Sequence, residues 1–327
     1  MNAVVMHQLG GPEVLRYQEW PDPEPEAGEV LVEVEAATVN RTDIFHRSGR
    51  FFIQKDLPHI LGMDVAGRIA ALGPEVTGWA VDDRVVATFE ELGRASDGAY
   101  AELVTVPVEE LHRIPDGLDY IHAAAIGRAF ATAWVALVHH GRMTADDTVL
   151  IQAASSGVGT SAVQIAHARG ARVIALSSAG KADRLKELGA DIVVDRNRNE
   201  VEDLVANATD GHGPSLVLEL VGRRTLQSSI EMAADNGRVI IAGTISGDEA
   251  EIDALDVLTK NLLLRGSSGR IRDEEWEEIL SGFAAGTYKA VIDEVLPLSA
   301  AAEAHERLED GETFGKLVLS PRLDREP

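Results

Sequence analysis

Residues 148–176 read TVLIQAASSGVGTSAVQIAHARGARVIAL, and this stretch decides how the surrounding chain folds. An apolar, strand-like run leads into a loop of small residues, then into an amphipathic stretch and a second apolar run. Ala154, Ser156 and Gly159 occupy the three positions of the pattern G-x-G-x-x-G, with two small residues in place of glycine. Small residues let the backbone approach a pyrophosphate, and a helix beginning at Gly157 offers free amides and a partial positive charge. The stretch therefore predicts a dinucleotide-binding loop between two parallel strands.

On the C-terminal side of this loop, the chain repeats the alternation of apolar runs and amphipathic stretches. Four more near-continuous apolar runs occupy residues 191–194, 215–220, 238–243 and 261–266, and amphipathic helical stretches separate most of them. Apolar strands that alternate with helices indicate a parallel sheet covered on both faces. Six such strands are the number in a complete dinucleotide-binding fold.

The chain before this region has a different character. Residues 1 to about 120 carry short runs of β-type residues separated by Gly and Pro, which is typical of a compact β-rich domain. After the sheet, residues 273–286 and 299–311 predict two helices, and residues 315–320 predict a final strand that pairs back into the N-terminal domain.

The fold prediction is therefore an α/β protein with two domains. A doubly wound parallel sheet is inserted into a β-rich domain. The predicted boundaries are residues 1–122 together with 269–327 for the β-rich domain, and 123–268 for the dinucleotide-binding domain.

The end of the second strand bears on the choice of cofactor. NAD enzymes carry an acid about 20 residues beyond the glycine motif, where it binds the ribose hydroxyls. This chain has Ser177 and Ser178 there, then Lys181 and Arg184, with no acid before Asp183. Hydroxyls and cations suit a 2′-phosphate, so the sequence favours NADP(H). The alternative is that the two cations only form the solvated face of the next helix.

The charge of the chain limits its partners and surroundings. Lys and Arg total 30 against 54 Asp and Glu, which gives a net charge of −24. The acids are dispersed, and only six of the basic residues are lysines. This pattern suits a surface that stays hydrated in concentrated salt, where screening removes self-repulsion. We expect the cytoplasm of a halophile, with no nucleic acid and no anionic membrane as partner.

Other compositional features exclude several kinds of chemistry. The chain has no cysteine, so it forms no disulfide and offers no thiolate ligand or nucleophile. No apolar run in the sequence approaches the ~18 residues that a membrane span needs. The N-terminal stretch MNAVVMHQLGG lacks the charged and then apolar layout of a signal peptide, so we expect a cytoplasmic protein.

Taken together, these motifs resemble a known superfamily. The sequence AASSGVG at 153–159, ATAW at 131–134 and FGKLVL at 314–319 are similar to the medium-chain dehydrogenases/reductases, and the similarity covers essentially the whole chain. The nearest branch is that of the quinone oxidoreductases and their enone- and enoyl-reducing relatives. The resemblance implies a Rossmann domain, a GroES-like catalytic domain and a homodimer formed through the edge strand at 261–266.

Zinc-dependent members of this superfamily hold a catalytic zinc at three positions. The matching stretches here are NRTD at 40–43, GMD at 62–64 and IGRAFATAW at 126–134, which places Asn40, Met63 and Arg128 at the ligand positions. A neutral amide, a thioether and a guanidinium do not hold Zn²⁺. We therefore expect no metal site.

The resemblance also implies roles for individual residues in metal-free reduction. Asn40 and Thr132 would lie near the nicotinamide and its ribose, and Thr42 would occupy a position where relatives use a hydroxyl in proton relay. Arg128 either supplies the positive charge that zinc supplies elsewhere or pairs with Asp64 or Asp43. Phe45 stands where relatives often have Tyr.

The candidate substrate-pocket residues are Phe45, His46 and Asp64. Read as part of an extended segment, His46 is expected to face solvent. Arg47 and Arg50 are expected either to line the pocket mouth, where they would attract an anionic substrate such as an acyl-CoA, or to form surface salt bridges. The predicted cofactor-binding residues are Ala154, Ser156, Gly157, Val158, Gly159, Ser177, Ser178, Lys181, Arg184, Thr132, Gly243 and Ser267.

The sequence thus predicts an NADP(H)-dependent oxidoreductase that reduces quinones or activated C=C bonds without a metal. One alternative is an alcohol or carbonyl dehydrogenase of the same superfamily. A second alternative is a protein that binds NADPH without turnover.

Overall fold

The computed structural model describes residues 1–51, 56–89 and 91–325, and the chain in it forms two compact units. Unit 1 comprises Met1–Arg128 and Glu274–Pro327, and unit 2 comprises Ala129–Asp273. The inserted unit is therefore the one that carries the dinucleotide-binding loop. The divisions lie a few residues beyond the predicted boundaries at 122 and 268, because one helix continues across the first of them.

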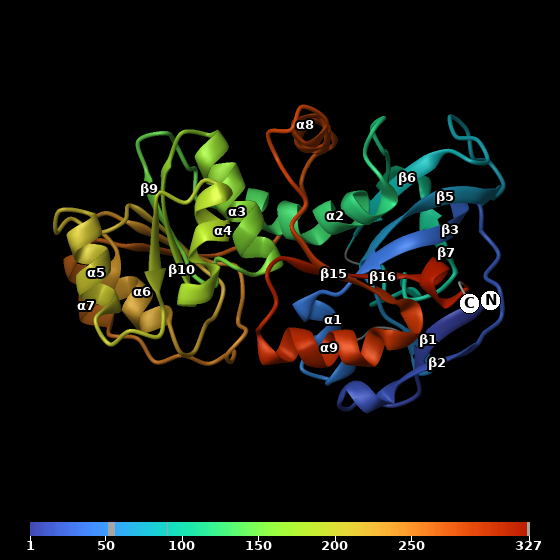
Figure 1. The fold of residues 1–327 in the computed structure, drawn as a ribbon, viewed down its shortest axis with the longest axis horizontal. Helices are drawn as coiled ribbons and strands as arrows, with labels where there is room; N and C mark the ends of the chain where they lie inside the picture. Colours follow the sequence, from blue (N-terminus) through green and yellow to red (C-terminus); the bar gives the residue numbers. More distant parts are fainter. Residues whose placement is uncertain (52–55, 90, 326–327) are drawn as a thin grey trace. The chain divides into compact units, whose positions relative to one another are not determined.

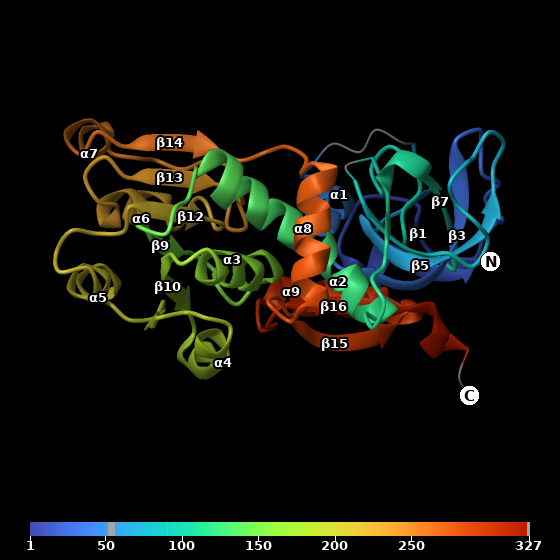
Figure 2. The ribbon, with the colours of Figure 1, turned by 90° about the horizontal axis from the view of Figure 1, so that it is seen from above.

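Unit 2 contains a six-stranded parallel sheet in the order β11-β10-β9-β12-β13-β14, as the alternation of apolar runs and helices predicts. Figure 2 shows β12, β13 and β14 side by side. The strands are β9 (Thr148–Ile151), β10 (Arg172–Ser177), β11 (Ile192–Asp195), β12 (Leu216–Glu219), β13 (Arg238–Ile241) and β14 (Leu263–Gly266).

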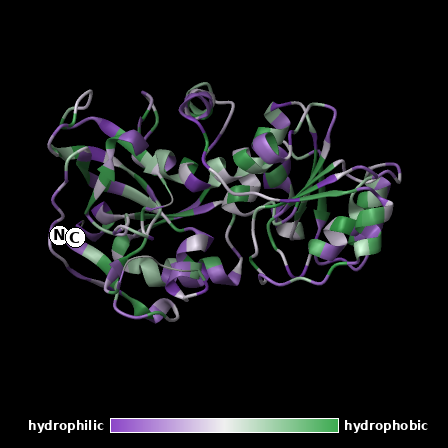
Figure 3. Ribbon diagram, turned by 180° about the vertical axis from the view of Figure 1, so that it is seen from behind, coloured by the Kyte–Doolittle hydropathy of each residue, from purple (hydrophilic) through white to green (hydrophobic). Residues whose placement is uncertain are grey.

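Helices cover both faces of this sheet. Figure 1 shows α3 and α4 on one face and α5, α6 and α7 on the other. The strands between them are predominantly hydrophobic (Figure 3), and side chains such as Leu150, Ile174 and Val217 are completely buried. The helices are α3 (Gly157–Ala168), α4 (Ala182–Glu187), α5 (Val201–Ala208), α6 (Leu226–Met232) and α7 (Ala254–Thr259).

Unit 1 is built on two β-sheets, which confirms the predicted β-rich domain. The larger sheet has the order β15-β16-β3-β5-β6-β8, with β7 also paired to β3, and the smaller has the order β2-β1-β4. The strands are β1 (Asn2–Met6), β2 (Leu15–Glu19), β3 (Glu29–Thr38), β4 (His59–Ile60), β5 (Asp64–Leu72), β6 (Arg84–Thr88), β7 (Leu103–Pro107), β8 (Leu111–Arg113), β15 (Ile292–Pro297) and β16 (Lys316–Ser320).

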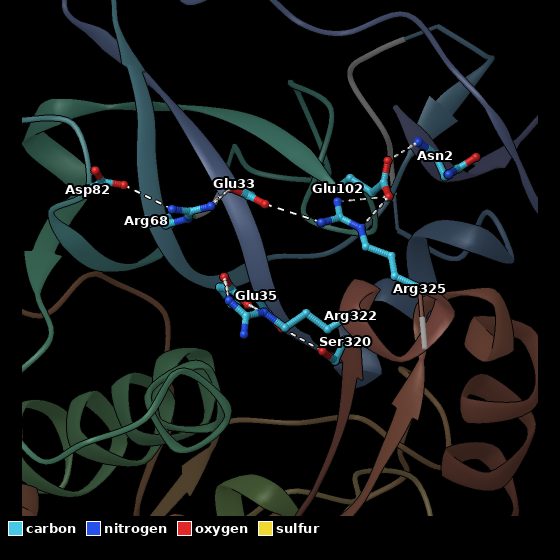
Figure 4. A network of polar contacts seen from close by, with 9 residues as sticks. All are labelled: Asn2, Glu33, Glu35, Arg68, Asp82, Glu102, Ser320, Arg322 and Arg325. Atoms are coloured by element: carbon cyan, nitrogen blue, oxygen red, sulfur yellow. Dashed lines mark hydrogen bonds and ion pairs between the residues drawn. The ribbon is translucent and has the colours of Figure 1, made fainter. Parts of the chain in front are cut away.

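The final strand returns to the N-terminal part of the chain, as predicted. β16 pairs antiparallel with β3, and Val318 lies opposite Thr38. Figure 4 shows how the segment after β16 is held: Arg322 forms an ion pair with Glu35 of β3, and Arg325 contacts Glu102 at 3.1 Å. Because Glu35 is buried, its charge requires this cationic partner.

Four longer helices accompany unit 1: α1 (Arg41–Arg47), α2 (Tyr120–Trp134), α8 (Asp273–Ala284) and α9 (Ala301–Asp310). In α8, Trp276, Ile279, Leu280 and Phe283 are all buried, as their spacing predicts. Short 3₁₀ turns occupy Pro12–Val14, Val108–Glu110, Ala179–Lys181, Leu298–Ala300 and Pro321–Asp324, and a π-helical turn occupies Val135–His140.

Within the described part of the chain, one helical run is long and apolar enough to cross a membrane. It extends from Tyr120 to His140 with a mean hydropathy of 1.5, and 67% of its most apolar window is buried inside the structure. The sequence shows no uninterrupted apolar run there, because polar residues such as His122, Arg128 and Thr132 are scattered along the helix. Burial of this kind is that of a helix packed into a protein core.

Candidate active site

The dinucleotide-binding loop has the geometry that its sequence predicts. α3 begins at Gly157, and the Ser156 hydroxyl caps it by accepting the Gly159 N–H at 3.0 Å. A Cβ at Gly159 would lie 2.4 Å from the carbonyl oxygen of Ala153 and 2.6 Å from the Cα of Ala154. Only glycine permits this approach of helix to strand, which is the role of the last glycine in the pattern. Val158, in the first turn of α3, is half-buried.

The carboxyl end of β10 lies against this loop. The Ala154 N–H donates to the Leu176 carbonyl at 3.0 Å, and the Lys181 ammonium lies 3.5 Å from the Ser155 hydroxyl. The Ser177 hydroxyl is buried and has no hydrogen-bond partner among the described residues. A buried hydroxyl without a partner, at the end of the strand that bonds to the phosphate loop, is available to bind a ligand group. Ser178 is half-buried, and Arg184 is exposed on α4.

The remaining predicted cofactor contacts in unit 2 divide into two groups. Gly243 follows β13 and Ser267 follows β14, where the Ser267 N–H donates to the Ile241 carbonyl at 2.8 Å. Because all six strands are parallel, these two residues share the carboxyl edge of the sheet with Ala154 and Ser177. Thr132 is apart from them in sequence, half-buried in the last turn of α2.

In unit 1 the central feature is a buried carboxylate, Asp64, at the start of β5. Its Oδ2 accepts hydrogen bonds from the hydroxyl of Thr38 and from Nδ2 of Asn40, the latter at 2.9 Å. Its Oδ1 accepts the Arg128 N–H at 2.7 Å. The side chain is fully buried, and its two oxygens hold the Thr38 hydroxyl, the Asn40 amide and the Arg128 N–H in place.

A break in α2 makes the contact with Arg128 possible. Gly127 has φ −8° and ψ −119°, which are not helical, so the Arg128 N–H is free to bond outside the helix. A Cβ at Gly127 would lie 2.2 Å from Asp64 Oδ1. The carboxylate therefore caps the second part of α2 by accepting the Arg128 N–H.

The cation that pairs with Asp64 is one that the sequence reasoning missed. Lys316, the first residue of β16, places its Nζ 3.6 Å from Asp64 Oδ2 and 2.7 Å from Asn40 Oδ1. Burial alone would raise the pKa of Asp64, but the Lys316 charge and the hydrogen bonds from Thr38 and Asn40 hold it below its ordinary value. A lysine in a chain with only six of them, inside an apolar strand, was the available signal.

A second buried chain of hydrogen bonds begins at the backbone of Asn40. The Asp43 carboxylate accepts the Asn40 N–H at 2.8 Å and the Tyr100 hydroxyl at 3.3 Å. Burial raises the pKa of Asp43 to about 7, against the lowering effect of the Asn40 hydrogen bond. The Tyr100 oxygen in turn lies 3.0 Å from His305 Nε2.

At the far end of this chain of hydrogen bonds, Arg47 fixes the tautomer of the His305 imidazole. Arg47 NH1 lies 3.2 Å from His305 Nδ1, and because a guanidinium only donates, Nδ1 must accept. Nε2 then carries the proton and donates to Tyr100. Burial, Arg47 and Arg41 lower the pKa of His305 to about 3. Tyr100 and His305 had no local sequence signal, because their partners lie far away along the chain.

Three expectations for residues 41–47 are wrong, and the reason is shared. The segment forms helix α1 and is not extended, so alternate side chains do not point in opposite directions. His46 is 1% exposed and does not face solvent; its Nδ1 has no hydrogen-bond partner among the described residues. Arg47 is 2% exposed and pairs with Glu309 at 2.9 Å, so it lines no pocket mouth and forms no surface bridge.

The neighbours of His46 are cationic. Burial, followed by the charges of Arg94, His59 and Arg128, lowers the pKa of His46 to about 4. Phe45 is nearly buried: Phe51 packs against its edge with ring centroids 4.9 Å apart, and the Arg50 guanidinium lies 4.1 Å above its ring. Thr42, also on α1, is half-buried.

Comparisons with known proteins agree with this architecture. Residues 26–116 match the family model of the alcohol dehydrogenase GroES-like domain, and residues 157–285 match that of the zinc-binding dehydrogenases. A quinone oxidoreductase from Lama guanicoe is 32% identical over 327 residues, which cover 98% of this chain and 97% of that protein. The chain belongs to the medium-chain dehydrogenase/reductase superfamily.

Solved structures of this superfamily confirm the fold. The crystal structure of an NAD-dependent alcohol dehydrogenase has a TM-score of 0.93 at 37% identity, covering 98% of this chain and 99% of that one. Escherichia coli quinone oxidoreductase, complexed with NADPH, has a TM-score of 0.89 at 28% identity, covering 98% and 100%. As predicted, the chain combines a Rossmann domain with a GroES-like domain, and its relatives identify it as an oxidoreductase.

Some members of the superfamily hold zinc, and the residues here do not fit that metal. Asn40 Oδ1, the donor at one ligand position, already accepts the Lys316 ammonium. Met63 and Arg128 occupy the other two positions, and neither is a zinc ligand. The described part of the chain contains no cluster of three His, Cys, Asp or Glu side chains able to hold a metal ion.

Proposed function

We propose that this protein is an NADP(H)-dependent oxidoreductase that reduces quinones or activated C=C bonds, such as enones and enoyl thioesters, without a metal. The observation that carries the proposal is the Asn40–Lys316–Asp64 group at the place where zinc-dependent relatives hold their metal. An ammonium, an amide and the adjacent Arg128 supply fixed positive charge and hydrogen-bond donors there. The quinone oxidoreductases among the relatives support the same reading.

The phosphate loop supports NADP(H) as the cofactor. Ser156, Gly157, Val158 and Gly159 at the start of α3 would hold the pyrophosphate, with Ala154 leaving room for it. Ser177, Ser178, Lys181 and Arg184 would hold the 2′-phosphate, and Thr132, Gly243 and Ser267 would contact the nicotinamide half. The buried, unpartnered Ser177 hydroxyl and the approach of Lys181 to Ser155 favour this assignment over a merely solvated helix face.

When bound, NADPH supplies a hydride to the acceptor and leaves as NADP⁺. The acceptor then carries negative charge on its carbonyl or quinone oxygen, and the residues of unit 1 stabilise it. We assign the Asn40 amide as a hydrogen-bond donor to that oxygen, and Arg128 as the source of positive charge. A donor already in place contributes a factor of roughly 10²–10³ in rate. The Thr42 hydroxyl delivers the proton that neutralises the product.

The pocket residues take different parts in this proposal. Phe45, whose ring packs against Phe51 and Arg50, would contribute an apolar wall beside the acceptor. His46 remains neutral near pH 7, because its pKa is lowered to about 4, and therefore does not act as a general acid in that range. Asp64 has its oxygens occupied by Thr38, Asn40 and Arg128, so its effect on the acceptor passes through those residues.

Two alternatives predict different behaviour. An alcohol or carbonyl dehydrogenase is favoured by one observation, the 37% identity to an NAD-dependent alcohol dehydrogenase. The missing zinc ligands weigh against that alternative. A protein that only binds NADPH would quench the cofactor fluorescence without oxidising it.

The deciding experiment follows NADPH oxidation in molar KCl by chelator-treated protein. A 1,4-quinone, an α,β-unsaturated ketone and crotonyl-CoA are offered in parallel, and the preferred acceptor defines the substrate class. Turnover with any of them supports metal-free reduction. If none of the three acceptors is reduced, and the protein acts on an alcohol or aldehyde after metal is added, the proposal is refuted in favour of the dehydrogenase. Binding without turnover on every acceptor refutes it in favour of the binding protein.

We also propose a homodimer formed through the edge of the parallel sheet. β14 is the edge strand, and Leu263 on it is 49% exposed, while Leu255 and Leu258 of α7 are 60% and 74% exposed. An open apolar edge is a site for pairing with another chain. Leu258→Glu should shift the protein from dimer to monomer in light scattering, and an unchanged mass would refute this interface. The acidic composition supports a cytoplasmic protein of a halophile.

A further inference from the structure

Lys316 is a buried cation whose direct contact with Asn40 the proposed chemistry has not yet used. Its side chain is 7% exposed. The Nζ donates to Asn40 Oδ1 at 2.7 Å and to the Val39 carbonyl at 3.1 Å, and it forms an ion pair with Asp64 at 3.6 Å. The ammonium thus has two hydrogen-bond acceptors, Asn40 Oδ1 and the Val39 carbonyl, and the Asp64 carboxylate as its ion-pair partner.

These contacts leave the Asn40 amide only one orientation. Lys316 can only donate and the Asp64 carboxylate can only accept, so Oδ1 must face the ammonium and Nδ2 must face the carboxylate. Turning the amide over would place its NH₂ group against Nζ and its carbonyl oxygen against Asp64. The two opposite charges therefore hold the Asn40 amide in one orientation.

The held amide retains one unused donor. Nδ2 carries two hydrogens, of which one bonds to Asp64 at 2.9 Å, and no second acceptor faces it in the part of the chain that the structure describes. Asn40 is 8% exposed, so this hydrogen has little water to bond with. Leaving a buried N–H without a partner costs free energy, so this hydrogen is available to donate to an acceptor atom of a ligand.

We infer that Lys316 is the positioning residue for this donor: acting with Asp64, it fixes Asn40 so that the second Nδ2–H is presented to the oxygen of the acceptor. This role rests on the proposed function, in which Asn40 bonds that oxygen. Preorganisation is what makes such a donor effective, because no reorientation is needed when charge develops. The competing role for Lys316 is to neutralise Asp64, which a buried carboxylate requires in any case.

A double-mutant cycle separates the two roles. Lys316→Met keeps the length and packing of the side chain but removes the ammonium, and Asn40→Ala removes the donor. If Lys316 acts through Asn40, Lys316→Met lowers kcat by roughly tenfold or more in the wild-type background, out of the 10²–10³ that the donor contributes. The same change leaves kcat nearly unaffected in the Asn40→Ala background. Lys289→Met, an exposed lysine of the same unit, is the matched control.

Two further measurements accompany the cycle and do not depend on turnover. The chain has seven asparagines, so selective ¹⁵N-asparagine labelling gives few side-chain amide signals, and Asn40→Ala assigns the one of interest. In Lys316→Met this signal should shift and broaden as the amide begins to turn, while Lys289→Met leaves it unchanged. The Kd for NADPH, measured by fluorescence, should stay within about twofold in Lys316→Met, because the cofactor loop lies in unit 2.

The outcomes are distinguishable. If wild-type protein turns over no acceptor, the proposed function fails, and this role fails with it. If wild-type protein is active but Lys316→Met costs the same factor in both backgrounds, or leaves the Asn40 signal unaltered, Lys316 only balances charge and the inference is wrong. Should Lys316→Met not fold, the neutral pair Lys316→Met with Asp64→Asn replaces it in the comparison. Wild-type kcat in that folded pair would also overturn the role.

Discussion

The buried imidazole of His305 should make the stability of this protein depend on pH in a way that a single substitution removes. His305 is fully buried between Arg47 and Tyr100, and its pKa is lowered from 6.5 to about 3, by burial first and then by Arg47 and Arg41. Between these values the unfolded chain binds a proton at this residue and the folded chain does not. The free energy of unfolding therefore falls as the pH falls through this window.

The magnitude follows from the size of the window. Each pH unit below 6.5 costs the folded state about 1.4 kcal/mol relative to the unfolded one, so at about pH 4.5 the loss is roughly 3 kcal/mol. His305→Gln cannot titrate, although its amide can still accept from Arg47. The variant should lose stability relative to wild type near pH 7, because packing and hydrogen bonds change. It should recover roughly 3 kcal/mol of that difference at about pH 4.5.

The assay is urea unfolding in constant KCl, followed by tryptophan fluorescence at a series of pH values. Trp20, Trp79 and Trp276 lie in unit 1 with His305, so three of the four tryptophans report on the relevant unit. His7→Gln, at an exposed position, controls for the exchange of an imidazole for an amide. A stability difference between His305→Gln and wild type that stays constant from pH 7 to about pH 4.5 would refute the reasoning.

Three other substitutions test the two candidate sites. Arg128→Met should lower kcat/KM by roughly 10²-fold with folding intact if the guanidinium stabilises charge on the acceptor, and an unchanged value rules out the catalytic role. Gly159→Ala should abolish measurable NADPH binding and lower the unfolding midpoint, because its Cβ would lie 2.4 Å from the Ala153 carbonyl; normal binding in calorimetry would contradict that geometry. Lys181→Ala should weaken NADPH binding by roughly tenfold or more while NADH changes little, and an equal loss for both would show that Lys181 does not read the 2′-phosphate.

The parallel sheet was predictable because its strands are buried on both faces. Each strand then reads as an apolar run, as in Val149–Ile151, and the small residues before α3 indicate the loop. Such signals lie within about 30 residues of one another. The same locality made α8 predictable from Trp276 and Phe283.

Helix α1 was missed although a local signal exists. Asp43 stands three residues after Asn40, and the two residues form a capping box at the helix start, in which the Asp43 carboxylate accepts the Asn40 N–H. The density of charged and polar residues from 40 to 47 outweighed this signal, because a helix with so few apolar residues looks solvated. The structure buries both His46 and Arg47 in spite of their polarity, and Arg47 finds its partner, Glu309, on another helix.

The buried polar group to which we assign the catalytic role could not be predicted from spacing, and the reason is physical. Asp64, Asn40 and Lys316 come from β5, the start of α1 and β16, and the pairing of β16 with β3 brings Lys316 beside Asn40. No local pattern encodes that meeting, but burial does constrain it. A lysine inside the apolar strand KLVLS must find acceptors or lose its charge, and the same holds for Asp64 at the start of DVAGRIAAL. Two opposite charges placed in apolar strands of one sheet are therefore best explained by each other, and whatever lies between them is held in one orientation.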